Sequence, residues 1–176
     1  IKLGQNGNYA VDIDGAVLWN IPLEQEYRDE IYQHIDSLLA LLQETPNPLW
    51  SPVEDRGSQV TFSPIGNQAP VDIKKAYDPD CSKRFALLEQ VPLESDNVVV
   101  KIGGSASFDY IHKDRHKGAN VQRLIELKGW KKEDCLYMGD GLYPGGNDEA
   151  VIGVIETMSV TDHIDTYAKL QNMLSA

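Results

Sequence analysis

The stretch Met138-Gly-Asp-Gly-Leu-Tyr-Pro-Gly-Gly-Asn-Asp148 decides how this chain is organised around its chemistry. It follows a short apolar segment, residues 135–138, that is typical of a buried strand. An acidic residue directly after such a strand lies at the carboxyl end of a sheet, where open α/β folds bind ligands. The glycines permit sharp turns, and Asp140 and Asp148 bring two carboxylates to one loop. Such oxygens suit Mg²⁺, so the stretch predicts a metal–phosphate site; a glycine-rich turn with solvated acids is the alternative.

A second signal lies upstream, where residues 116–120 open an amphipathic helix with apolar residues at helical spacing. Lys117 lies at the start of this helix, where the macrodipole favours anions. A lysine there weakens the helix unless an anion is bound beside it. Lys117 is therefore a candidate clamp for a phosphoryl group. An exposed lysine at a helix end is the alternative, and the acidic loop one helix and one strand later favours the clamp.

The composition is that of an ordinary globular chain with an acidic balance. The 176 residues are 41% hydrophobic and 24% charged, and the formal net charge is −11. That charge argues against nucleic-acid and anionic-membrane partners, which select basic patches. No apolar run reaches about 18 residues, so no membrane span is expected. Cys81 and Cys135 lack metal-ligand spacing and favour a reduced, cytoplasmic setting.

The first part of the chain mixes strands and helices around an expected antiparallel sheet. Residues 8–20 predict a hairpin about the Asp14-Gly15 turn signal, and residues 23–43 predict a long amphipathic helix. Further elements are expected as a strand at 58–62, a helix from Asp78 to about Gln90, and paired strands at 97–101 and 105–111.

From about His112 the pattern changes to helix, strand, loop, strand and helix, which is typical of a piece of a parallel α/β sheet. The two strands are expected at residues 135–138 and 151–155. The helices are expected at 118–128 and around 164–173. Two strands are too few for a complete doubly wound sheet.

These blocks together resemble the haloacid dehalogenase superfamily, in the cap-bearing branch of eukaryotic-type phosphomannomutases and related bacterial sugar phosphatases. Residues 55–66, Asp-Arg-Gly-Ser-Gln-Val-Thr-Phe-Ser-Pro-Ile-Gly, are similar to one cap signature of that branch, and residues 103–109, Gly-Gly-Ser-Ala-Ser-Phe-Asp, to a second. The resemblance implies an α/β protein: a partial Rossmann-like core in the C-terminal half, and an α+β cap domain with an antiparallel sheet. It implies a cap over residues 5–111 and a core from residues 1–4 and 112–176.

The resemblance also implies a role for four residues of the core. Lys117 matches the lysine that neutralises the transferring phosphoryl group, a main resource in phosphoryl transfer. Asp140 matches the aspartate that ligates Mg²⁺. Asn147 and Asp148 match the pair that completes or orients the Mg²⁺ shell, with a turn capped by its own side chains as the alternative.

In the cap, three residues match substrate-binding positions of the family. Arg56 matches an arginine that grips phosphate, which a guanidinium can bind bidentately. Ser107 and Asp109 match residues that hydrogen-bond sugar hydroxyls, and strand alternation places both on one face. The polar face of an ordinary solvated sheet is the alternative.

The family's reaction needs an aspartate nucleophile followed two residues later by a second aspartate. Asp12 and Asp14 imitate this motif. We favour a hairpin with an Asp-Gly turn, because Ala16 replaces the family's Thr or Ser and residues 6–9 are too polar for a buried parallel strand. The nucleophile is then expected upstream of Ile1, and the lack of an initial Met also indicates a chain that starts partway through a larger protein.

The function implied by the resemblance is a Mg²⁺-dependent phosphoryl-transfer enzyme, most simply a phosphatase that acts on a small sugar phosphate through an aspartyl phosphate. Phosphomannomutases carry an arginine after Ser-Pro-Ile-Gly, where this chain has Asn67. Asn67 lacks the positive charge of that arginine, which favours a phosphatase over a phosphomannomutase. Phosphomannomutase is the first alternative function. The second is a non-catalytic chain that binds a sugar phosphate or a partner. A homodimer through the cap is a further expectation.

Overall fold

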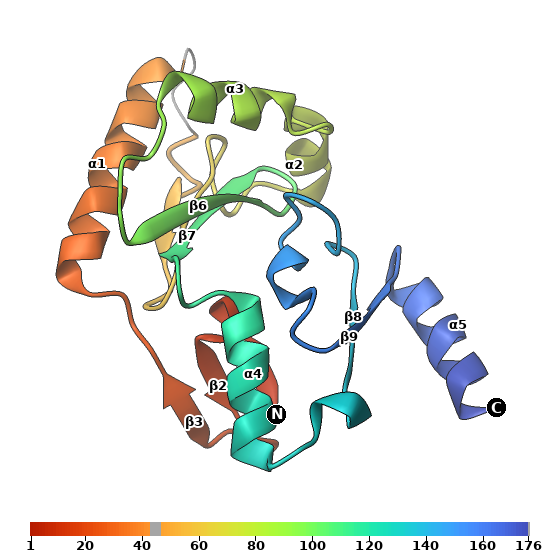
Figure 1. Cartoon of the computed structure of the whole chain (residues 1–176). Coiled ribbons are helices and arrows are strands. Elements are labelled where there is room, and N and C mark those ends of the chain that lie inside the picture. The colour runs from red at the N-terminus through yellow and green to blue at the C-terminus, as the bar shows by residue number, and fades with distance from the viewer. Residues whose placement is uncertain (43–46, 176) are drawn as a thin grey trace. The chain divides into compact units, whose positions relative to one another are not determined.

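A computed structural model describes residues 1–42 and 47–175, which form two compact units, Ile1–Arg115 and His116–Ala176 (Figure 1). The change of pattern expected near His112 thus falls a few residues later. Residues 1–4, which the resemblance assigned to the core, are counted with the first unit because β1 (Lys2–Gly4) pairs with β2 (Tyr9–Val11). In the part of the chain that is described, no helix is long and apolar enough to cross a membrane.

The first unit begins with a three-stranded antiparallel sheet in the order β1-β2-β3, with β3 at Val17–Asn20. The hairpin predicted over residues 8–20 is confirmed as the β2–β3 pair. In its turn, Oδ1 of Asp12 accepts hydrogen bonds from the backbone N–H groups of Asp14 and Ala16, at 2.9 and 2.8 Å. The Asp12 side chain therefore serves the turn, as aspartates commonly do.

A four-stranded antiparallel sheet forms the centre of the first unit, in the order β4-β5-β7-β6. Its strands are β4 (Val53–Asp55), β5 (Val60–Phe62), β6 (Val98–Gly103) and β7 (Ser107–His112). The two strands expected from residues 97–111 are confirmed as β6 and β7, which pair from Val98↔His112 to Gly103↔Ser107.

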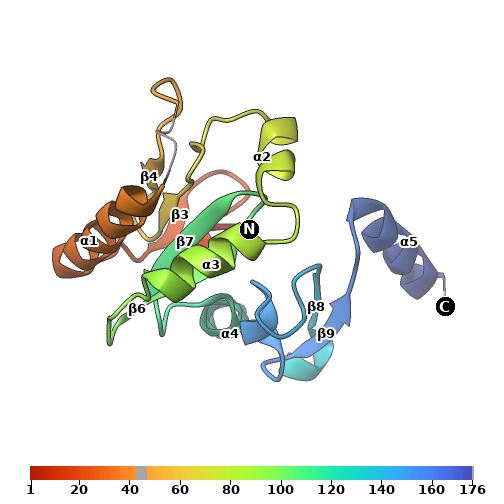
Figure 2. The same ribbon diagram turned by 90° about the horizontal axis from the view of Figure 1, so that it is seen from above.

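Alternation divides the central β5–β7 pair into an apolar face and a polar face. Val60 lies opposite Tyr110, and Phe62 lies opposite Phe108, with the two phenyl rings stacked 5.7 Å apart. All four are buried in a core with apolar residues of α1 (Gln25–Leu41) and α3 (Ser82–Gln90), and both helices lie against this sheet (Figure 2). Thr61 and Asp109, paired between these positions, face the other way. The polar face is therefore available for a site.

Both long helices of this unit follow their predictions, whereas two short strands and one short α-helix were missed. α1 falls within the predicted 23–43, whose last residue lies outside the described part, and α3 falls within the helix predicted from Asp78. The missed elements are the three-residue strands β1 and β4 and the helix α2 (Val71–Tyr77). α2 has no buried residue, so it leaves no apolar period in the sequence.

The second unit contains α4 (Lys117–Lys128), β8 (Leu136–Gly139), β9 (Glu156–Ser159) and α5 (His163–Leu174). β8 and β9 pair in parallel, as expected for a piece of an α/β sheet. The strand predicted at 151–155 is wrong, because Glu149–Val151 forms a 3₁₀ turn and the strand starts at Glu156. Gly153, with φ of +84°, breaks the extended run that its apolar neighbours suggested.

Candidate functional site

An ion pair joins the start of α4 to the end of the acidic loop. Nζ of Lys117 lies 2.5 Å from Oδ1 of Asp148, and the Asp148 side chain is only 3% exposed. The close approach depends on Gly118, where a Cβ atom would lie 1.9 Å from the carbonyl oxygen of Ala150. A lysine at a helix start is unfavourable unless an anion lies beside it, and here that anion is the Asp148 carboxylate of the same unit.

Asp148 is held by three donors in all. Besides Lys117, the hydroxyl of Tyr137 donates to Oδ1 at 2.8 Å, and the N–H of Gly141 donates to Oδ2 at 3.1 Å. Burial raises the pKa of Asp148, but the hydrogen bonds from Lys117 and Tyr137 outweigh it, so the pKa lies below its ordinary value. The carboxylate therefore stays ionised and fixes the ammonium group of Lys117 in place.

Tyr137 is a member of this site that the sequence did not reveal, because a tyrosine within a predicted buried strand suggests core packing. Burial, together with the hydrogen bond to Asp148 and the charges of Asp148 and Asp140, raises its pKa far above the ordinary value. The phenol thus remains a protonated donor. Asp140 is next in the chain to Gly141, whose N–H donates to Asp148.

The other two predicted residues of the loop are exposed. Asp140 follows β8 directly, with its side chain toward solvent. Asn147 lies against the backbone of Gly141, where a Cβ atom would meet Oδ1 of Asn147 at 2.1 Å. The four residues predicted in the core, Lys117, Asp140, Asn147 and Asp148, are thus gathered on one helix start and one loop.

These residues fit part of a Mg²⁺ shell. Within the described ranges, no group of three or more His, Cys, Asp or Glu residues could hold a metal ion. Both oxygens of Asp148 already accept hydrogen bonds, so Asp148 is better placed to orient Lys117 than to ligate the metal. Asp140 offers an exposed carboxylate, and Mg²⁺ commonly binds one or two carboxylates with waters and a phosphate. The ligand roles of Asp140 and Asn147 stay predictions.

A polar hollow of about 330 Å³ lies on the polar side of the central sheet in the first unit, and Arg56, Ser107 and Asp109 all line it. Two further charged residues, Glu54 and Lys74, line it as well. Neither was found from the sequence, because they belong to β4 and α2, which the sequence did not predict. The three residues predicted for substrate binding are therefore brought together in one cavity.

Both donors and acceptors line this hollow. Nη2 of Arg56 donates to Oε2 of Glu54 at 2.8 Å, and that bond is the largest cause that lowers the pKa of Glu54. Oγ1 of Thr61 donates to Oδ1 of Asp109 at 2.8 Å. Nζ of Lys74 donates at 2.6 Å to the carbonyl oxygen of Asn67. Two cations and two carboxylates thus share the cavity, with no excess of either charge.

One wall of the hollow contains a buried hydroxyl without a protein partner. The oxygen of Ser63, a residue that is 1% exposed, has no hydrogen-bond partner among the described residues. Leaving a buried hydroxyl unpaired costs about 1–3 kcal/mol. Asn67, in contrast, is used structurally, since its Nδ2 donates to the carbonyl oxygen of Pro52 at 2.9 Å. Ser63 is therefore the group of this wall that a bound ligand or water would satisfy.

Comparisons with known proteins identify the fold. No protein-family model and no curated protein sequence matches the chain. The IMP-bound, N-terminally truncated IMP-nucleotidase of Plasmodium falciparum is similar in structure, with a TM-score of 0.63 at 14% identity over 99% of this chain and 48% of that one. SMU.1108c of Streptococcus mutans UA159 is similar with a TM-score of 0.61 at 16% identity, over 99% of this chain and 76% of that one. A haloacid dehalogenase-like hydrolase of B. subtilis is similar with a TM-score of 0.56 at 10% identity, over 94% of this chain and 76% of that one.

These structures show which fold the present chain has and how much of it is aligned. It spans about half the length of the IMP-nucleotidase and about three quarters of the other two chains. The mixed α/β arrangement of its helices and sheets is shared along almost all of its length. The chain has the fold of the cap-bearing haloacid dehalogenase superfamily.

Proposed function

We propose that this chain is the cap and part of the core of a Mg²⁺-dependent phosphatase that hydrolyses a sugar phosphate. The observation that carries the proposal is the Lys117–Asp148 ion pair on the loop that Asp140 opens. An ammonium group has three N–H donors. One is engaged by Asp148, so two are left for the oxygens of a phosphoryl group. A fixed positive charge of this kind stabilises the charge that develops during phosphoryl transfer.

The metal and the nucleophile complete the proposal. Asp140 would hold Mg²⁺, which supplies charge neutralisation at the phosphoryl oxygens when it is bound. We assign the nucleophile, which would form the aspartyl phosphate, to polypeptide outside these 176 residues. Asp12 is a poor candidate because its Oδ1 already accepts two backbone N–H groups in an exposed hairpin turn.

The polar hollow of the first unit, here called the cap hollow, favours an uncharged, hydroxyl-rich group over a second phosphate. A hydroxyl both donates and accepts, which suits a cavity lined by the cations Arg56 and Lys74 and by the carboxylates Glu54 and Asp109. A phosphate dianion would have to compete with Glu54 for the guanidinium of Arg56. This balance supports a sugar-phosphate phosphatase over phosphomannomutase, whose bisphosphorylated intermediate must be held at either end.

The test uses the complete protein that contains these residues, assayed for phosphate release from hexose phosphates with Mg²⁺ or with EDTA. One structural neighbour is an IMP-nucleotidase, so a nucleoside monophosphate belongs in the same panel. Lys117→Met should lower kcat about 10²–10³-fold, as expected for removing one electrostatic donor. Lys128→Met, the same change at an exposed position of the same helix, is the matched control. Unchanged turnover in Lys117→Met would refute the proposal, and conversion of mannose 1-phosphate to mannose 6-phosphate faster than phosphate release would indicate the mutase.

A non-catalytic sugar-phosphate-binding chain is the second candidate, favoured by the engagement of Asp12 in its turn and by the lack of a three-ligand metal group in the described residues. The mass of the natural protein separates the two, because about 19.6 kDa would favour the binding chain. Cytoplasmic residence and a homodimer through the cap are also proposed. Cell fractionation and sedimentation equilibrium test them.

A further inference from the structure

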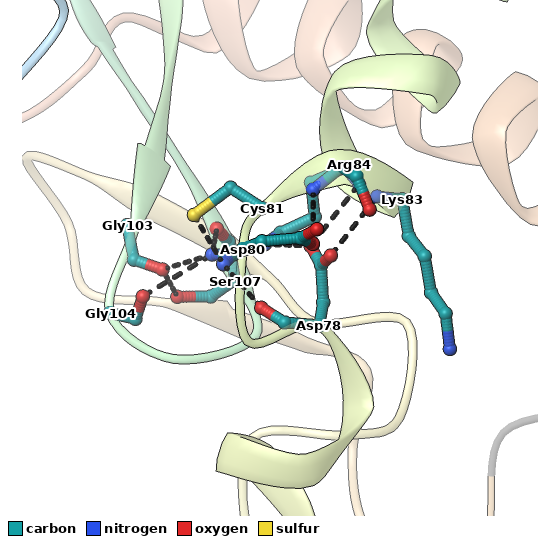
Figure 3. A network of polar contacts seen from close by, with 9 residues as sticks. Asp78, Asp80, Cys81, Lys83, Arg84, Gly103, Gly104 and Ser107 are labelled. Atoms are coloured by element: carbon teal, nitrogen blue, oxygen red, sulfur yellow. Dashed lines mark hydrogen bonds and ion pairs between the residues drawn. The ribbon is translucent and has the colours of Figure 1, made fainter.

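A buried ion pair lies beside the cap hollow. The side chains of Arg84 and Asp78 are 1% and 0% exposed, and Nε of Arg84 donates to Oδ2 of Asp78 at 2.7 Å. The Asp78 carboxylate also accepts from the backbone N–H groups of Lys83 and Arg84 in the first turn of α3, at 3.0 and 3.2 Å (Figure 3). One carboxylate therefore satisfies the helix start and fixes the guanidinium group.

The Nη1 end of the Arg84 guanidinium group is hydrogen-bonded to the turn between β6 and β7. Nη1 of Arg84 donates to the carbonyl oxygens of Gly103, Ser107 and Gly104, at 2.9, 3.1 and 3.3 Å (Figure 3). Gly103 and Ser107 are the last pair of the β6–β7 ladder. One side chain thus joins both strand ends and gives the carbonyl groups of the turn a charged donor.

The same turn carries the substrate-binding wall of the hollow. Oγ of Ser107 donates to the carbonyl oxygen of Gly103 at 2.9 Å, which leaves the lone pairs of this hydroxyl able to accept from a ligand. A Cβ atom on Gly103 would lie 2.4 Å from Oδ2 of Asp109, so this carboxylate rests against the glycine backbone. A shift of Gly103 would therefore move both polar groups.

We infer that Arg84, held by Asp78, is a positioning residue that sets the places of Ser107 and Asp109 and thereby the sugar selectivity of the cap. Arg84 does not touch the substrate; it acts through the carbonyl groups of the turn. The planar guanidinium group binds Asp78 through Nε while its Nη1 meets the carbonyl groups of the turn, whereas the single ammonium group of a lysine cannot reach both sides at once. The inference rests on the proposed function, because it concerns how the same cavity recognises its sugar.

The experiment compares Arg84→Lys with wild type in the complete protein. Arg84→Lys keeps the charge beside Asp78, so folding should be retained. With the best hexose phosphate, KM should rise about tenfold while kcat at saturation changes less than about twofold. The kcat/KM ratio for two hexose phosphates that differ at one carbon should also change. Amide hydrogen exchange at residues 104–106 should become faster.

Leu38→Ala is the matched control, because Leu38 is fully buried in the α1 core, away from the cavity lining, and its truncation lowers stability by opening a space. This variant should keep the wild-type KM and selectivity ratio. If Arg84→Lys loses thermal stability as Leu38→Ala does, yet keeps KM, the ratio and the exchange at 104–106, the inference is wrong and the ion pair is only structural.

Two further outcomes keep this inference separate from the proposed function. If wild type hydrolyses p-nitrophenyl phosphate but no sugar phosphate, the proposed function is wrong and the inference falls with it. If Arg84→Lys does not fold, exchange is measured on wild type with an unreactive hexose phosphonate. Slower exchange at residues 104–107 supports the inference, and unchanged exchange there in an otherwise active enzyme overturns it alone.

Discussion

Replacement of Asp148 by asparagine should destabilise the protein by about 3 kcal/mol. Asp148 is nearly fully buried and accepts from Lys117, Tyr137 and Gly141. Removing one partner of a buried ion pair costs about 3–5 kcal/mol, because a charge and its donors are left without compensation. The Lys117 side chain is 26% exposed and can regain some hydration, so the lower end of that range applies.

The assay is urea unfolding at pH 7 of wild type, Asp148→Asn and the control Asp140→Asn. The control makes the same chemical change on the same loop, but at an exposed side chain, so its free energy of unfolding should stay within about 0.5 kcal/mol of wild type. Equal effects of the two substitutions would refute the idea that the Lys117–Asp148 pair organises this loop.

Three further predictions follow from the same geometry. Gly118→Ala should lower the free energy of unfolding by more than about 2 kcal/mol, measured by thermal melting, because the added methyl would collide with the carbonyl of Ala150; a melting temperature equal to wild type would contradict the close approach. Asp12→Asn in the complete protein should leave turnover unchanged, and a phosphoryl adduct trapped on Asp12 would show the hairpin interpretation of its role to be mistaken. The folded-state pKa of Asp148 lies below its ordinary value of 3.8, so the stability that its ionised form contributes is present above pH 3.8 and is lost as the pH falls through the folded-state pKa. The difference in free energy of unfolding between wild type and Asp148→Asn should therefore shrink at acid pH. A difference that stays constant with pH would contradict this linkage.

The local chemistry of the sequence predicted the parts of the fold that depend on short-range patterns. The Asp-Gly turn marked the first hairpin, and the apolar stripe of α1 marked its helix. Alternation along β7 placed Ser107 and Asp109 on one face, and the structure confirms this arrangement by burying Phe108 and Tyr110 on the other. These features could be predicted because each is decided within a few residues.

The features that were missed depend on contacts between distant segments. Lys74 reaches the cap hollow from a helix without buried residues, and Ser63 loses its solvent only when the central sheet is assembled. Arg84 lies on an ordinary amphipathic helix, and its three carbonyl partners are about twenty residues further along the chain. Val151 is apolar and buried as expected, but the backbone after it turns at Gly153 instead of continuing as a strand.

The central claim is that Lys117 and the loop opened by Asp140 bind a phosphoryl group together with Mg²⁺. The most direct measurement is a crystal structure of the complete protein with Mg²⁺ and fluoroberyllate, a mimic of the phosphoryl group. We expect fluoride atoms within hydrogen-bond distance of Nζ of Lys117, and a carboxylate oxygen of Asp140 in the first shell of the metal. Fluoroberyllate bound elsewhere, with Lys117 paired only to Asp148, would contradict it.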